Sequence, residues 1–214
     1  MSTLKPDFIL FTDGSVEKHT PRGSAGCGFV IVDVIKGEFS LFSEQVLGHK
    51  DKIANSAFIE ILAVLYGIRK LKKIAPEGSK ILIVTDNLMV VRNFNYNLKH
   101  SWSLPKRKDW TDKNGYPVLG QKQLREIINI CYDSQYKIRV IHIHSHTNRN
   151  ITIPSKAIHQ IQHDLEKYNV TGDSDVSDSF IPELFIQFNR LADLCAKAAT
   201  KHTKKRYKGR KLQI

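Results

Sequence analysis

Residues 7–12 (DFILFT) are a short apolar run that ends at a carboxylate, Asp13. Two further runs rich in Val, Ile and Phe follow at residues 26–34 (GCGFVIVDV) and 39–46 (FSLFSEQV). The pair Lys-Gly at residues 36–37 lies between them and is typical of a tight turn. Three short runs connected in this way predict an antiparallel meander of three strands.

Helices and strands alternate after the meander. Residues 55–73 carry apolar side chains at helical spacing, and Pro76 ends that helix. Residues 81–85 (ILIVT) are a continuous apolar run, which is typical of a strand buried on both faces. The remaining predicted elements are a helix at 121–131, a strand at 138–144 (IRVIHIH) and a helix at 189–200 (NRLADLCAKAAT).

The helix at residues 55–73 follows the third strand and precedes the fourth. A right-handed crossover through this helix places the fourth strand parallel to the first, on its free side. The predicted fold class is therefore α/β, a five-stranded mixed sheet of order 3-2-1-4-5 with helices on both faces. The end of the first strand then becomes a topological switch point, where open α/β sheets form clefts.

Four carboxylates are expected to converge at this switch point. Asp13 follows the first strand and Asp86 the fourth, so parallel pairing brings both to one edge of the sheet. Glu60 belongs to the helical row that faces the sheet, and Asp193 has apolar neighbours in the last helix. A buried carboxylate without a partner is costly, so a partner or a metal ion is implied.

Clustered carboxylates raise one another's pKa, and divalent cations relieve the repulsion. Ligation by oxygen alone selects Mg²⁺ or Mn²⁺. Two such ions about 3.5–4 Å apart activate an attacking water and stabilise the leaving oxygen of a phosphodiester. The alternative is that each acid is a helix cap or a salt-bridge partner.

The chain is basic, with 33 Lys and Arg against 21 Asp and Glu and a formal net charge of +12. This excess favours a polyanionic partner, most simply nucleic acid. Residues 99–125 combine basic side chains with Trp102, Trp110 and Tyr116, which suits phosphate neutralisation and stacking. Residues 201–214 are a basic tail, either a phosphate-binding arm or a solubilising end, and we expect it to be flexible.

Other protein classes are disfavoured. No apolar run approaches the length of about 18 residues that a membrane span needs, and residues 1–11 do not resemble a secretory signal. Cys27, Cys131 and Cys195 are far apart and form no CxxC pair, so no disulfide framework is expected. We therefore predict a reducing compartment and a cytoplasmic location.

Six motifs occur in order along the chain. Together they resemble the type 1 ribonuclease H family over about residues 8–200. The matching stretches are Phe11-Thr-Asp-Gly-Ser15, Gly26-Cys-Gly-Phe-Val30, Glu60-Ile-Leu-Ala63, Ile83-Val-Thr-Asp-Asn87, Ile143-His-Ser-His146 and Asn189-Arg-Leu-Ala-Asp193.

The resemblance implies metal-dependent hydrolysis of the RNA strand of RNA–DNA hybrids with two Mg²⁺ ions, for which Mn²⁺ is a possible substitute. It places Asp13, Glu60, Asp86 and Asp193 in the metal-binding catalytic set. It also matches His146 to a mobile histidine that assists proton transfer or product release, an assignment that the alternating His142, His144 and His146 leave open.

The resemblance also implies substrate contacts. Backbone groups after the first Asp and an Asn before the Glu would recognise RNA 2′-hydroxyls, and a basic protrusion would hold the DNA strand. The residues assigned in this way are Gly14, Ser15, Asn55, Ser56, Asn87, Trp102, Lys106, Arg107, Lys108, Trp110 and Asn189.

The chain departs from the family pattern at two places. Asn55 lies five residues before Glu60, where the family has three or four, so the helix entry is shifted or Ser56 substitutes. Residues 147–188 are an atypical insertion with a predicted helix and an acidic loop. It would be a lid, a substrate-selecting element, a docking site for a replication protein, or a segment packed on the surface. We expect one domain at residues 1–200 and a monomer.

Two other functions remain open from the sequence. The same fold could serve a DNA nuclease, resolvase or integrase relative. The chain could also be a non-catalytic module that binds hybrids or RNA. Cleavage of hybrid, duplex DNA and duplex RNA separates these hypotheses.

Overall fold

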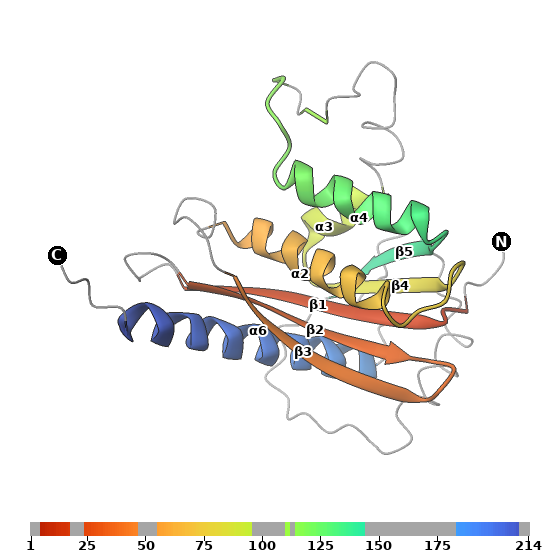
Figure 1. Cartoon of the computed structure of the whole chain (residues 1–214), viewed down its shortest axis with the longest axis horizontal. Helices are drawn as coiled ribbons and strands as arrows, with labels where there is room; N and C mark the ends of the chain where they lie inside the picture. The colour runs from red at the N-terminus through yellow and green to blue at the C-terminus, as the bar shows by residue number, and fades with distance from the viewer. Residues whose placement is uncertain are drawn as a thin grey trace.

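The computed structural model describes residues 5–17, 24–46, 55–95, 110–111, 114–143 and 183–209. Its centre is a five-stranded sheet of order β3-β2-β1-β4-β5 (Figure 1). The strands are β1 (Phe8–Glu17), β2 (Ser24–Asp33), β3 (Glu38–Val46), β4 (Lys80–Thr85) and β5 (Lys137–His142). β1 and β3 pair antiparallel with β2, whereas β4 is parallel to both β1 and β5. The predicted fold class and strand order are confirmed.

Helices cover both faces of the sheet (Figure 1). They are α2 (Ser56–Leu71), α3 (Leu88–Arg92), α4 (Gln121–Asp133) and α6 (Glu183–Gly209). Successive side chains of β1 point to opposite faces of the sheet, as in any strand. Phe8 and Leu10 join the core beneath α2 and α4, while Ile9 and Phe11 join the core beneath α6.

The first strand is longer than the sequence suggests. β1 continues through Asp13 to Glu17, because its far half pairs with Ser24–Gly28 of β2. Its parallel pairing with β4 stops at Thr12 and Thr85. Asp13 therefore lies within a strand rather than after it, although it is still the first residue beyond the parallel ladder.

The last helix is also longer than predicted at both ends. α6 begins at Glu183, inside the segment expected to be an insertion, because Leu184, Phe185 and Phe188 are buried at helical spacing against the sheet. Its backbone stays helical to Gly209, so the first nine residues of the expected tail continue the helix. Lys and Arg are good helix formers, which favours this extension. None of the described helices has the length and apolarity to span a membrane.

Candidate active site

Two of the four acids meet where β1 and β4 separate. Thr12 and Thr85 are the last parallel partners, and Asp13 and Asp86 are the next residues on the two strands. Asp13 is 8% exposed, whereas Asp86 is half-buried. His142 on β5 lies with Nε2 3.1 Å from the backbone oxygen of Asp86, which ties the end of β4 to its neighbouring strand.

Glu60 reaches the same place from α2 because a glycine lets the helix approach. A Cβ on Gly14 would lie 2.9 Å from both the Glu60 nitrogen and the Ile59 carbonyl carbon, closer than real side chains allow. A hydrogen bond from the Gly14 backbone N–H to the Glu60 carboxylate opposes the rise of its pKa. Gly14 thus brings α2 close to the sheet and also donates to the carboxylate that the helix carries.

The carboxylate oxygens of Asp13, Glu60 and Asp86 all lie within 4.8 Å of one another. Glu60 is 6% exposed, and its Oε2 is buried without a hydrogen-bond partner among the residues that the structure describes. A buried carboxylate oxygen that no protein group satisfies is costly, and hard divalent cations prefer such oxygens. These three side chains, here named the inner carboxylates, therefore fit a site for Mg²⁺ or Mn²⁺.

Asp193 reaches the inner carboxylates from the opposite face of the sheet. Gly28 of β2, the ladder partner of Asp13, lies directly under α6. A Cβ on Gly28 would lie 2.0 Å from the Ala192 oxygen and 2.3 Å from the Ala196 nitrogen. The missing side chain therefore lets the helix backbone pack directly on the strand beside Asp13. Asp193 forms an ion pair with Lys197, whose Nζ lies 2.7 Å from Asp193 Oδ2.

The electrostatics of the site reflect this crowding. Burial, followed by the negative charges of Asp86 and Asp193, raises the pKa of Asp13 to about 8. Burial, followed by the charges of Asp13 and Asp86, raises the pKa of Glu60 well above its usual range. A hydrogen bond with the Asp193 carboxyl adds to the rise in the pKa of Asp13. The geometry brings three of the four predicted carboxylates within 4.8 Å of one another, and Asp193 acts on Asp13 from outside this group.

Two of the three asparagines expected to contact substrate, Asn55 and Asn87, act as helix N-caps. Asn55 Oδ1 accepts from Phe58 N at 3.3 Å at the start of α2, and Asn87 Oδ1 accepts from Met89 N at 3.0 Å at the start of α3. Ser56 is exposed on the first turn of α2. The shifted position of Asn55 thus coincides with a capping role.

Ser15 and Asn189 flank the site on β1 and α6. The Ser15 backbone oxygen accepts from Thr200 Oγ1 at 3.1 Å, which fixes β1 to α6. Asn189 lies one turn before Asp193 and is fully buried, and within the described part of the chain neither its Oδ1 nor its Nδ2 has a hydrogen-bond partner. An unsatisfied buried amide of this kind is uncommon in proteins.

Trp110 is placed as an anchor at the base of the expected protrusion. Its ring packs against the core beneath α4, with the Arg125 guanidinium 5.4 Å from the ring centroid. Its backbone oxygen accepts from Val118 N at 3.0 Å and from Gln121 Nε2 at 3.3 Å. Trp102, Lys106, Arg107, Lys108, His146 and residues 147–182 of the expected insertion lie outside the described residues.

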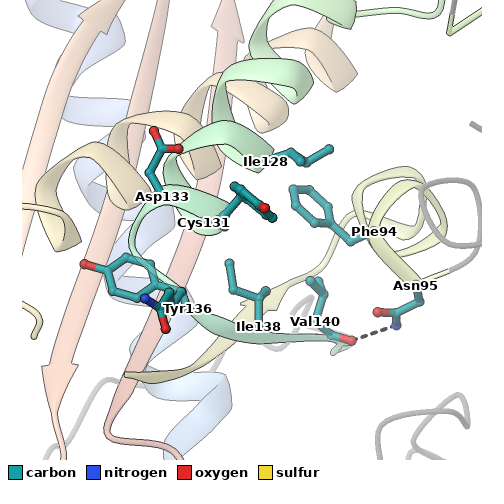
Figure 2. A pocket seen from close by; sticks show the side chains of 10 residues that line it. Phe94, Asn95, Ile128, Cys131, Asp133, Tyr136, Ile138 and Val140 are labelled. Atoms are coloured by element: carbon teal, nitrogen blue, oxygen red, sulfur yellow. Dashed lines mark hydrogen bonds between the residues drawn. The ribbon is translucent and has the colours of Figure 1, made fainter. Parts of the chain in front are cut away.

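A cavity of about 700 Å³ opens between α4, β5 and the end of α3 (Figure 2). Phe94, Ile128, Ile138 and Val140 line it, and Asn95 Nδ2 donates to the Val140 oxygen at 2.8 Å. None of the four acids lines this cavity. The acids thus lie at a different place from this pocket.

Sequence reasoning missed two features of the site. Gly28 appeared only as part of a motif, and its close contact with α6 could not be seen from one strand. The ion pair of Asp193 with Lys197 could have been found from the i, i+4 spacing of opposite charges in a predicted helix.

The sequence matches the RNase H family model over residues 5–157. The chain belongs to the RNase H family. Membership places this RNase H chain among the ribonuclease H enzymes, and the match includes the three inner carboxylates but ends before Asp193. No curated protein sequence matches the chain.

Solved structures share the fold. The foamy viral protease-reverse transcriptase in complex with RNA/DNA hybrid aligns with a TM-score of 0.60 and 18% identity, over 94% of this chain and 21% of that one. The chain thus spans about a fifth of that viral protein. LC11-RNase H1, isolated from compost by a metagenomic approach, aligns with a TM-score of 0.51 and 15% identity, over 92% and 97% of the two chains.

Proposed function

We propose that this RNase H chain hydrolyses the RNA strand of RNA–DNA hybrids, using two divalent cations held by Asp13, Glu60, Asp86 and Asp193. The observation that carries the proposal is the group of inner carboxylates, whose oxygens lie within 4.8 Å of one another in a member of the RNase H family. The foamy viral structure in complex with RNA/DNA hybrid supports the choice of substrate. The net charge of +12 supports a polyanionic one.

Each residue has a distinct task in this proposal. The inner carboxylates are metal ligands supplied by three elements, and Asp193 completes the set from α6. Mg²⁺, or Mn²⁺ in its place, would polarise the scissile phosphate and lower the pKa of the attacking water. Gly14 and Gly28 keep α2 and α6 close enough for the four side chains to meet.

The substrate side of the proposal rests on fewer described residues. Gly14 and Ser15 follow Asp13 directly on β1, and we infer that they contact a bound strand. Asn189 is fully buried one turn before Asp193, and its substrate contact stays a prediction from the sequence. Trp102, Lys106, Arg107, Lys108 and His146 keep their predicted roles as proposals. A monomeric state, a cytoplasmic location and a replication-protein partner at the insertion stay predictions from the sequence.

A panel of three end-labelled duplexes tests the proposal. The same RNA sequence is presented as RNA–DNA hybrid and as RNA duplex, beside a DNA duplex, each with Mg²⁺ and with EDTA. Cleavage confined to the RNA of the hybrid and lost in EDTA is the expected result. Cleavage of duplex DNA would favour a DNA nuclease, and binding without cleavage in either Mg²⁺ or Mn²⁺ would favour a binding module.

A further inference from the structure

Asp193 differs from the inner carboxylates in having a cation from its own helix. Lys197, one turn further along α6, places Nζ 2.7 Å from Asp193 Oδ2. The distance is that of a strong charge-assisted hydrogen bond. The Lys197 side chain is 57% exposed and that of Asp193 is 30% exposed, so the pair lies at the rim of the site.

The charge of the same carboxyl group also acts on one of the inner carboxylates, Asp13. Asp193 raises the pKa of Asp13 through its charge and through a hydrogen bond. Asp193 is nevertheless outside the group of three whose oxygens all lie within 4.8 Å. Asp193 thus stands between two positive partners, the Lys197 ammonium and any divalent cation bound by Asp13.

We propose that Lys197 is a positioning residue that competes with a divalent cation for Asp193 and so weakens the second metal position of the free protein. This inference rests on the proposed function. A divalent cation that uses Asp193 must displace the ammonium or bind beside it, and either adds an unfavourable charge interaction. The half-exposed, flexible lysine stem lets the ammonium move into water at modest cost.

The competition predicts unequal metal sites. A position built from the inner carboxylates uses Asp13 and Glu60, and neither of them belongs to an ion pair of the described residues. A metal position that depends on Asp193 uses a carboxylate whose negative charge is already paired with the Lys197 ammonium. Occupancy of the second position therefore rises only at higher cation concentration.

Calorimetric titration of the full chain with Mn²⁺, without nucleic acid, tests the inference. Lys197→Met should tighten the weaker binding event about three- to tenfold, since one exposed competing charge is removed. Lys197→Arg keeps the charge and should stay within about twofold of wild type. Lys201→Met removes a charge one turn further along the same helix and is the matched control, also expected within about twofold.

The Mg²⁺ dependence of hybrid cleavage gives a second readout. Lys197→Met should lower the Mg²⁺ concentration for half-maximal cleavage by a similar factor. Thermal unfolding in EDTA checks that each variant is folded. An unchanged or weaker Mn²⁺ affinity in folded Lys197→Met, or equal tightening in Lys201→Met, would overturn the inference while leaving the proposed function in place. A wild-type chain that binds no Mn²⁺ and cuts no hybrid would overturn both.

Discussion

The inner carboxylates and Asp193 all lie near other negative charges, but their surroundings differ. Asp13 and Glu60 are buried, and their pKa values rise because water cannot stabilise the charged forms. Asp193 is partly exposed and takes a cation from Lys197 on its own helix. Under the proposed function, the inner group would take its positive charge from a bound cation, and under the inference above Asp193 would set how readily a second cation binds.

Removing an inner carboxylate should have the largest effect on activity. Asp13→Asn takes away the group that contacts Glu60, Asp86 and Asp193, so hybrid cleavage should fall by at least about a thousandfold. Hybrid cleavage by Asp193→Asn should fall less, by about ten- to a hundredfold, because the inner carboxylates remain. Single-turnover cleavage at saturating enzyme measures both. Equal losses in the two variants would erase the distinction between inner and outer acids.

The two glycines that bring the acids together can be compared in the same way. Gly28→Ala would place a Cβ 2.0 Å from the Ala192 oxygen, so α6 must shift, and we expect a loss of about 3 kcal/mol in the free energy of unfolding. Gly14→Ala meets atoms at 2.9 Å and should cost about 1 kcal/mol.

Denaturant unfolding measures both glycine variants. Gly37→Ala is the control for glycine loss alone, since no atom lies within 4 Å of its added Cβ, although its φ of +72° adds strain. A Gly28→Ala variant as stable as wild type would contradict the close packing of α6 on β2.

The pH dependence of stability should reflect the raised pKa of Asp13 in the inner carboxylates. In the unfolded chain Asp13 has the usual pKa of an aspartate, 3.8, whereas in the folded protein its pKa is about 8. Between these values the folded state retains a proton that the unfolded state has lost, so rising pH destabilises the metal-free protein. In EDTA, the midpoint temperature should fall by about 5 °C more from pH 6 to pH 8 in wild type than in Asp13→Asn.

Mg²⁺ should suppress that fall, because a bound cation replaces the proton on the inner carboxylates. Differential scanning calorimetry at both pH values, with and without Mg²⁺, measures this. If wild type and Asp13→Asn show the same pH dependence in EDTA, the elevated pKa of Asp13 is wrong.

The smallest expected effect concerns a buried polar side chain beside Asp193. Asn189→Leu removes an amide that has no hydrogen-bond partner in the described ranges, and it should stabilise the protein by about 1 kcal/mol. Thr200→Val, on the same helix, removes bonds to Ser15 and Ala196 and should destabilise it by about 1 kcal/mol. Chemical denaturation compares the two. A destabilised Asn189→Leu would mean that the amide is satisfied in solution.

Much of the site could be predicted because its chemistry is local to each element. The apolar run before Asp13, the continuous apolar strand before Asp86 and the helical row containing Glu60 each follow from side-chain period. The strand order then brought these residues to one edge, and the structure confirms the order. Parallel pairing of β1 and β4 is the step that turns three separate patterns into one site.

The remaining features depend on contacts between elements. β1 extends past Asp13 because β2 pairs with it, and α6 begins early because Phe185 and Phe188 pack on Phe11. The capping roles of Asn55 and Asn87 depend on where their helices begin. Such boundaries are set by tertiary packing, which local propensity does not contain.

A hybrid labelled on both strands tests the central claim most directly, with wild type and Asp13→Asn compared in Mg²⁺ and in EDTA. The account predicts that wild type shortens only the labelled RNA, and only in Mg²⁺, and that Asp13→Asn leaves both strands intact. Cleavage of the DNA strand, cleavage in EDTA, or near wild-type cleavage by Asp13→Asn would contradict it.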